Sequence, residues 1–217
     1  MANLLHIDTS PRGERSQSRA LSKYFVEAWK DSHLEDSITY RDVGRNSIPH
    51  VDEPWIAACF TSPEKRTSDM WEAIALSEQL VDELMAANVY VIGVPMYNFN
   101  VPSGFKAYID QIVRVGRTYA FEPEDKESPY KPLVHGKKMF IITAHGAGGF
   151  APGGRLEKLN HQAPYLKTAF GFIGITDITF ISVENDELGG QKLADSIAAA
   201  RAQINKLVNV PAINQNK

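Results

Sequence analysis

The amino-acid sequence predicts an α/β protein built on a doubly wound, five-stranded parallel sheet with helices on both faces. Short, strongly apolar runs alternate along the chain with segments of helical periodicity. The run at residues 89–94 is almost entirely β-branched or aromatic, as a strand buried on both faces of a parallel sheet requires. Three of the runs end in polar or glycine-rich loops, and open α/β sheets bind their ligands at such loops.

The predicted strands are short apolar segments bounded by polar residues, glycine or proline. In chain order they are residues 4–9, 38–43, 89–94, 138–143 and 176–183. Between them, apolar side chains at positions i, i+3, i+4 and i+7 predict helices. These helices carry residues 21–28, begin at Ser68, cover residues 104–114, open at Pro164, and carry residues 193–207.

Two stretches do not follow this alternation. Residues 44–68 are too long for an ordinary connection, and we expect irregular chain with one short helix near residues 53–60. Residues 115–136 show no periodicity and carry many charges. Long loops without secondary structure in compact domains are functional lids or disordered segments, and the aromatic residues Tyr119, Phe121 and Tyr130 favour a lid.

The composition is that of an ordinary globular protein, with 43% hydrophobic and 23% charged residues. The 217 residues are expected to form one domain over residues 1–208, followed by a polar tail at residues 209–217. The net charge is −3 and the basic residues are scattered, so no nucleic-acid partner is expected. Cys59 is the only cysteine, so neither a disulfide within the chain nor a metal site is predicted. No signal peptide or membrane span is recognised, and a cytoplasmic location is the default expectation.

The loop after the first strand, residues 10–18, is rich in hydroxyl groups and leads into a helix. A helix N-terminus offers unpaired N–H groups and partial positive charge, and Ser10, Ser16 and Ser18 add hydroxyl donors. This combination can hold a phosphate group. The alternative, that Ser16 or Ser18 only caps the helix, is equally consistent with the sequence.

The loop after the third strand has the composition expected for contact with a flat ligand that has polar edges. Met96, Tyr97 and Phe99 can pack on a planar ring. Asn98 and the backbone amides can pair with the nitrogens and carbonyls of such a ring. The alternative is a surface turn whose aromatic side chains fold back into the core. Ser103, which follows the loop, is predicted to cap the next helix.

The loop after the fourth strand, residues 144–150, contains clustered glycines. Glycine lets the backbone approach a ligand closely and exposes its N–H groups, although a flexible connector is the alternative. In a sheet with the flavodoxin-like strand order 2-1-3-4-5, the first, third and fourth strands are neighbours. Their loops together describe a site for a mononucleotide with a flat ring, and FMN is the expected cofactor.

Three motifs extend this interpretation over essentially the full chain. They are Ser10-Pro11-Arg12 with Ser16-Gln17-Ser18, then Pro95-Met96-Tyr97-Asn98-Phe99-Asn100-Val101-Pro102, and finally Gly171-Phe172-Ile173-Gly174-Ile175-Thr176. With these motifs the sequence resembles the bacterial FMN-dependent NADH-azoreductases, a family that also reduces quinones. The resemblance implies that FMN phosphate is bound by Ser10, Ser16, Gln17 and Ser18, and that the isoalloxazine ring is contacted by Met96, Tyr97, Asn98, Phe99, Thr143, His145, Gly146 and Gly148.

The resemblance also implies a homodimer in which aromatic residues of one subunit complete the active site of the other. The residues expected to bind substrate are Phe99 together with Tyr119, Phe121 and Phe172, the last three acting across the dimer interface. NADH or NADPH would pass a hydride to N5 of the flavin and leave, and a quinone or aromatic azo compound would then receive two electrons. No side chain is predicted to be catalytic.

Two other classes of function are compatible with parts of the pattern. An electron-carrying flavodoxin, without a small-molecule acceptor of its own, would share the fold but would need no loop such as residues 115–136 to cover a substrate. A hydrolase would depend on Ser103 or His145. The sequence around Ser103 lacks the G-x-S-x-G nucleophile elbow, so this class is the weaker alternative.

Overall fold

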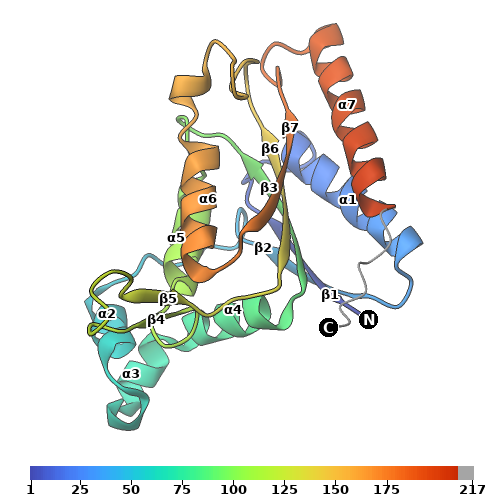
Figure 1. Ribbon diagram of the computed structural model, residues 1–217. Coiled ribbons are helices and arrows are strands. Elements are labelled where there is room, and N and C mark those ends of the chain that lie inside the picture. The colour runs from blue at the N-terminus through green and yellow to red at the C-terminus, as the bar shows by residue number, and fades with distance from the viewer. Residues whose placement is uncertain (210–217) are drawn as a thin grey trace.

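The computed structural model describes residues 1–209 and is centred on a five-stranded sheet with the order β2-β1-β3-β6-β7 (Figure 1). Its strands are β1 (Asn3–Asp8), β2 (Ser37–Asp42), β3 (Val89–Pro95), β6 (Lys138–Ala144) and β7 (Asp177–Val183). All neighbouring strands are parallel, so the predicted doubly wound, flavodoxin-like sheet with the order 2-1-3-4-5 is confirmed. Of the predicted polar tail, residues 210–217 lie outside the described part of the chain.

Helices cover both faces of the sheet (Figure 1). One face carries α1 (Gln17–Ser32) and α7 (Gly190–Val208), and the other carries α4 (Ala75–Ala86), α5 (Ser103–Ile112) and α6 (Gln162–Ile173). Successive side chains of a strand point to opposite faces, so β3 is buried on both sides. Val91 packs with α1 and α7, whereas Tyr90 and Ile92 pack with α4, α5 and α6. None of the helices within residues 1–209 has the length and apolar character needed to cross a membrane.

Helix boundaries between β2 and β3 depart from the prediction. The short helix α2 (Glu53–Phe60) is confirmed, and a 3₁₀ turn (Pro63–Lys65) follows it. The single helix expected to begin at Ser68 is wrong, because the chain forms α3 (Ser68–Ala73) and then α4. The break falls at Ile74, whose side chain is completely buried in a small cluster with Trp55 and Cys59. Tertiary packing therefore overrides the helical periodicity at this residue.

Further along the chain, a second 3₁₀ turn (Glu157–Leu159) precedes α6. This helix begins at Gln162 rather than at Pro164, where the sequence predicted it to open. Proline is tolerated in the first turn of a helix, because the N–H group that it lacks would have no partner there. Pro164 therefore signals the beginning of the helix without being its first residue.

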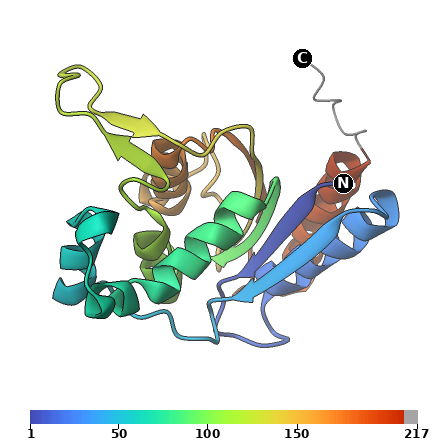
Figure 2. The ribbon, with the colours of Figure 1, turned by 90° about the horizontal axis from the view of Figure 1, so that it is seen from below.

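The stretch at residues 115–136, expected to be irregular, contains a hairpin of β4 (Tyr119–Phe121) and β5 (Tyr130–Pro132). Figure 2 shows the hairpin projecting from the body of the protein. The rings of Phe121 and Tyr130 lie 5.3 Å apart across the strands, and such pairs stabilise antiparallel ladders. Each strand has only three residues, too few to produce a detectable alternating pattern, and the expectation of an irregular loop is wrong for this reason.

Candidate functional site

The loop between β1 and α1 holds three buried hydroxyl groups at the N-terminus of a helix. Ser10 and Ser18 are completely buried, and Ser16 is nearly so. Ser16 is the N-cap of α1, because its Oγ accepts a hydrogen bond of 3.4 Å from the Arg19 N–H and lies 3.1 Å from Ser18 Oγ. Gln17 is the first residue of the helix. Capping by Ser16 is therefore confirmed, and it coexists with the arrangement of helix N-terminus and hydroxyls that binds phosphate groups.

Gly93 allows this loop to lie close to the sheet. It stands within β3, opposite Asp8 of β1. A Cβ atom at Gly93 would lie 2.9 Å from the Ser18 carbonyl oxygen and 3.0 Å from the Asp8 carboxylate. Thr9 donates from its N–H and its hydroxyl to the Gly93 carbonyl, at 3.1 and 2.9 Å. The first turn of α1 can approach the sheet at this point because Gly93 has no side chain.

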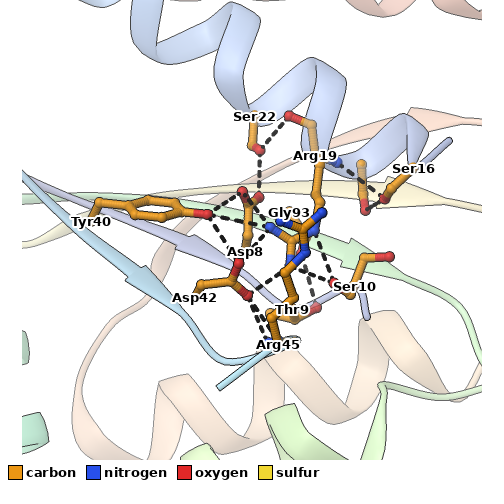
Figure 3. A network of polar contacts seen from close by, with 12 residues as sticks. Asp8, Thr9, Ser10, Ser16, Arg19, Ser22, Tyr40, Asp42, Arg45 and Gly93 are labelled. Carbon is orange, nitrogen blue, oxygen red and sulfur yellow. Dashed lines mark hydrogen bonds and ion pairs between the residues drawn. The ribbon is translucent and has the colours of Figure 1, made fainter. Parts of the chain in front are cut away.

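An ion-pair network connects the same loop to the end of β2 (Figure 3). The Arg19 guanidinium pairs with Asp42 at 2.6 Å and with Asp8 at 3.3 Å, and all three side chains are almost entirely buried. Burial alone raises the pKa of the Asp42 carboxyl, but hydrogen bonds from Arg19 and from backbone N–H groups leave that pKa below its ordinary value. None of the sequence motifs pointed to this network. Its signal was that two neighbouring strands both end in aspartate.

The loop after β3 contains a tight turn with two residues in the left-handed region. Tyr97 and Asn100 exchange backbone hydrogen bonds of 2.8 and 3.0 Å. Asn98 and Phe99, between them, have φ angles of 48° and 67°, which residues other than glycine seldom adopt. Surrounding structure must hold this conformation, and such strain is concentrated at functional sites. Phe99 is 46% exposed and Met96 half-buried, so Phe99 does not fold back into the core as the alternative required.

The expected cap by Ser103 is wrong. Pro102 is the N-cap of α5, and no side chain caps this helix. Ser103 is the first helical residue, so its hydroxyl lies one position too far along the chain for N-cap geometry. It instead lines a cleft of about 320 Å³, together with Tyr97 and with Arg45 and His50 from the loop after β2. The sequence analysis assigned no role to that loop.

The loop after β6 is held by a carboxylate. The N–H groups of Gly149 and Phe150 donate to Glu184 at 3.2 and 3.3 Å. The imidazole of His145 is buried, its Nε2 lies 3.3 Å from the side-chain oxygen of Gln162, and burial lowers its pKa. The side chain of His145 is therefore buried in the protein, and its backbone N–H and carbonyl pair with Val183 and Asp186 at 2.9 and 3.0 Å.

Three further residues predicted to contact the flavin ring, Thr143, Gly146 and Gly148, lie at the end of β6 or in the loop after it. Thr143 is buried, and its hydroxyl donates to Ser182 of β7 at 2.9 Å, so it also points into the protein. Gly146 and Gly148 are partly exposed, and within residues 1–209 their N–H groups donate to no other group of the protein. A Cβ atom at Gly146 would lie 2.5 Å from the side chain of Glu187. These two glycine amides are the open donors of the loop.

The register of the sheet brings the three loops to one edge. Asp8, Gly93 and Ile142 are aligned across β1, β3 and β6, and each strand ends within two residues of that line. The hydroxyl-rich, aromatic and glycine-rich loops therefore emerge side by side, at the edge where open α/β sheets bind ligands. The family model described as a flavodoxin-like fold matches residues 2–208. The chain belongs to this flavodoxin-like family.

Curated members of the flavodoxin-like family match the chain over nearly its whole length. The FMN-dependent NADH:quinone oxidoreductase 2 of Trichormus variabilis is 52% identical over 209 residues, covering 96% of this chain and 99% of its own. The FMN-dependent NADH:quinone oxidoreductase of Nostoc punctiforme is 54% identical, with coverages of 94% and 97%. The resemblance found in the sequence motifs is thereby confirmed.

Solved structures of the flavodoxin-like type agree with the fold. An azoreductase from Bacillus anthracis aligns with a TM-score of 0.85 at 23% identity, covering 96% of this chain and 99% of that one. An FMN-dependent NADH-azoreductase from the same organism, in complex with FMN, aligns with a TM-score of 0.83 at 21% identity, with coverages of 96% and 98%. At these identities the likeness shows the fold alone.

The aromatic residues predicted to bind substrate across a dimer interface do not join the three loops within this flavodoxin-like chain. Tyr119 and Phe172 lie 4.9 Å apart between ring centroids, and Tyr130 contacts both. Phe172 stands in the last turn of α6. Figure 1 shows that this end of α6 lies beside the hairpin, at the edge of the sheet where the strands begin. Phe121, on the hairpin, is 51% exposed. This aromatic cluster (Tyr119, Phe121, Tyr130 and Phe172) therefore lies at the opposite edge from the loops.

Proposed function

We propose that this protein is an FMN-dependent NAD(P)H oxidoreductase that reduces quinones and aromatic azo compounds by two-electron, ping-pong transfer. The observation that carries the proposal is the convergence of three loops at one edge of the sheet, each with the chemistry that a different part of FMN requires. The near full-length likeness to curated FMN-dependent NADH:quinone oxidoreductases supports the same assignment.

The loop before α1 suits the phosphate group. The hydroxyls of Ser10, Ser16 and Ser18 are buried together with the N-terminus of a sixteen-residue helix, where free N–H groups and the helix dipole favour an anion. In the proposal, Ser10, Ser16, Gln17 and Ser18 bind the phosphate. These hydroxyls already form hydrogen bonds within the loop, Ser16 with Ser18 and Ser10 with the Arg12 N–H. A hydroxyl can donate one hydrogen bond and accept two, so Ser10 and the acceptor of the Ser16–Ser18 pair can still donate to a phosphate oxygen.

The other two loops suit the flavin ring. Met96, Tyr97, Asn98 and Phe99 form the strained turn over which a planar ring can stack. The open N–H groups of Gly146 and Gly148 can donate to polar atoms at the edge of the ring. When bound, FMN would accept two electrons from the nicotinamide donor and deliver them to the acceptor. The protein would supply binding, orientation and electrostatic stabilisation.

We also propose that the active protein is a homodimer, in which the aromatic cluster of one subunit completes the site of the other. The support is that Phe121, Tyr130 and Phe172 are between 37% and 51% exposed although they are large and apolar. Light scattering on the wild type should give a dimer, and Phe121→Asp should weaken it. Leu34→Asp is the matched control, because Leu34 is 88% exposed and lies between α1 and β2. A monomeric wild type would contradict the proposal.

The function is tested by incubating the protein with FMN, removing the unbound FMN, and recording the visible spectrum without oxygen. NADH or NADPH should bleach the flavin bands, and a quinone or an azo dye should restore them. A protein that stays colourless would contradict the assignment of FMN as the cofactor. A flavin that remains oxidised with both donors would favour the electron carrier instead.

The double variant Ser16→Ala and Ser18→Ala should weaken FMN binding. Ser32→Ala is the control and should leave it unchanged, because Ser32 is exposed at the far end of α1.

A further inference from the structure

We propose that Arg19, together with Asp42, is a positioning residue that preforms the loop between β1 and α1, residues 9–16, which is the proposed phosphate loop. In this way it would give the protein its preference for FMN over unphosphorylated flavin. This inference rests on the proposed function. Arg19 lies in the first turn of α1, and its side chain turns back toward the loop that precedes the helix (Figure 3). None of the sequence motifs includes it.

The Arg19 guanidinium forms two hydrogen bonds to the backbone carbonyl of Ser10. Arg19 Nη2 and Nε both donate to the Ser10 carbonyl oxygen, at 2.5 and 2.9 Å. The Ser10 side chain is completely buried, and its Oγ accepts from the Arg12 N–H at 3.2 Å. The carbonyl group and the side chain of Ser10 are therefore held separately. A loop held in this way loses little conformational freedom when a ligand binds, and preorganisation of this kind raises affinity.

Asp42 holds the Arg19 guanidinium and the turn after β2 in place. Its carboxylate accepts from both terminal nitrogens of Arg19, at 2.8 and 2.6 Å, and from the N–H groups of Gly44 and Arg45 at 3.1 and 3.0 Å. Gly44 then packs directly against the loop, because a Cβ atom there would lie 2.3 Å from the Ser10 carbonyl oxygen. The Ser10 peptide is thus enclosed between Arg19 and the turn after β2.

Arg19 has no N–H group left for the phosphate itself. Nε is used by Ser10, Nη2 by Ser10 and Asp42, and Nη1 by Asp42, Asp8 and the Tyr40 hydroxyl. Its single positive charge also faces two carboxylates, so the network contributes no excess positive charge to attract an anion. Its effect on phosphate must therefore come through the geometry of the loop.

The test compares the dissociation constants of FMN and riboflavin for the apoprotein, measured by flavin fluorescence quenching. Arg19→Lys keeps the charge but cannot form the fork of hydrogen bonds to Ser10 and Asp42. We expect FMN to bind about tenfold more weakly and riboflavin to bind unchanged, because the loss of one charge-assisted hydrogen bond pair corresponds to about that factor. Arg41→Lys is the matched control. Arg41 precedes Asp42 in the sequence, and within the described residues its side chain pairs with Glu83 and not with the loop.

Asp42→Asn separates geometry from charge and serves as the second variant if Arg19→Lys does not fold. It makes the protein one charge more positive, so a purely electrostatic role predicts tighter FMN binding. Positioning predicts weaker FMN binding with riboflavin unchanged. The inference is overturned if the ratio of the two constants stays at its wild-type value in Arg19→Lys, if Arg41→Lys changes it equally, or if Asp42→Asn binds FMN more tightly. A wild type that binds neither flavin would overturn the proposed function instead.

Discussion

Replacing Gly93 by alanine is expected to destabilise the protein and to weaken FMN binding at the same time. The added methyl group would lie 2.9 Å from the Ser18 carbonyl oxygen, closer than real Cβ contacts, and 3.0 Å from the Asp8 carboxylate, which is tighter than most of them. Neither neighbour is the free end of a flexible side chain, because the first is backbone and the second is held by Ser22 and Arg19. The first turn of α1 must therefore move away from β3.

The magnitude follows from two opposing terms. Inserting a methyl group into a well-packed site costs about 1–3 kcal/mol. Alanine regains about 0.5–1 kcal/mol, because glycine loses more backbone freedom on folding. These ranges combine to a net loss of about 0–2.5 kcal/mol in the free energy of unfolding. Because the nearest neighbour is rigid backbone, we expect the upper part of this range, about 1–2 kcal/mol. For a chain of this length, that loss lowers the melting temperature by roughly 2–8 °C.

Urea unfolding at a fixed protein concentration and a fluorescence titration with FMN measure the two effects. The same substitution at Gly171 of α6 is the control for stability, since a Cβ atom there meets nothing within 4 Å. Gly171→Ala should leave stability unchanged or raise it by up to about 1 kcal/mol, the difference in helix propensity. A Gly93→Ala protein as stable as the wild type would refute the packing argument. A destabilised variant with unchanged FMN affinity would refute the link to the phosphate loop.

Burial lowers the pKa of His145, so the stability it contributes is present above its ordinary pKa of 6.5 and is lost as pH falls through the lower folded value. His145→Gln should therefore flatten the decline in unfolding free energy as pH falls below about 6.5, and an unchanged slope would count against this reasoning. Glu184→Ala should speed hydrogen exchange at Gly149 and Phe150 about tenfold, because both amides lose their acceptor, and equal rates would show that Glu184 does not hold the loop. Burial and Asp8 raise the pKa of Tyr40 to about 12, so stability present below pH 10 should be lost between pH 10 and 12, and Tyr40→Phe should remove part of that loss in alkaline urea titrations.

Local patterns in the chain were sufficient for the architecture and for the chemistry of the three loops. The runs of β-branched residues and the i, i+3, i+4, i+7 spacing depend only on neighbours in sequence, and they identified all five strands of the sheet. Because parallel strands end at one edge, the strand order then brought the loops that carry Ser16, Phe99 and Gly146 to the same edge of the sheet. The hydroxyl, aromatic and glycine content of these loops is likewise visible in the sequence itself.

The tertiary structure decided the features that depend on contacts between distant residues. Ile74 breaks a helix because its side chain is buried against α2, and no local pattern records that contact. The Thr143 and His145 side chains point into the protein because Ser182 and Gln162 are there to receive them.

The same holds for the support of the phosphate loop and for the aromatic cluster. Arg19 reaches Asp42 across 23 residues, and Gly93 is required by a helix turn 75 residues away in sequence. The aromatic cluster lies at the far edge of the sheet because α6 runs antiparallel to the strands and carries Phe172 away from the loops. Sequence periodicity reports which face of an element is buried, but the partner on that face is chosen only when the elements pack.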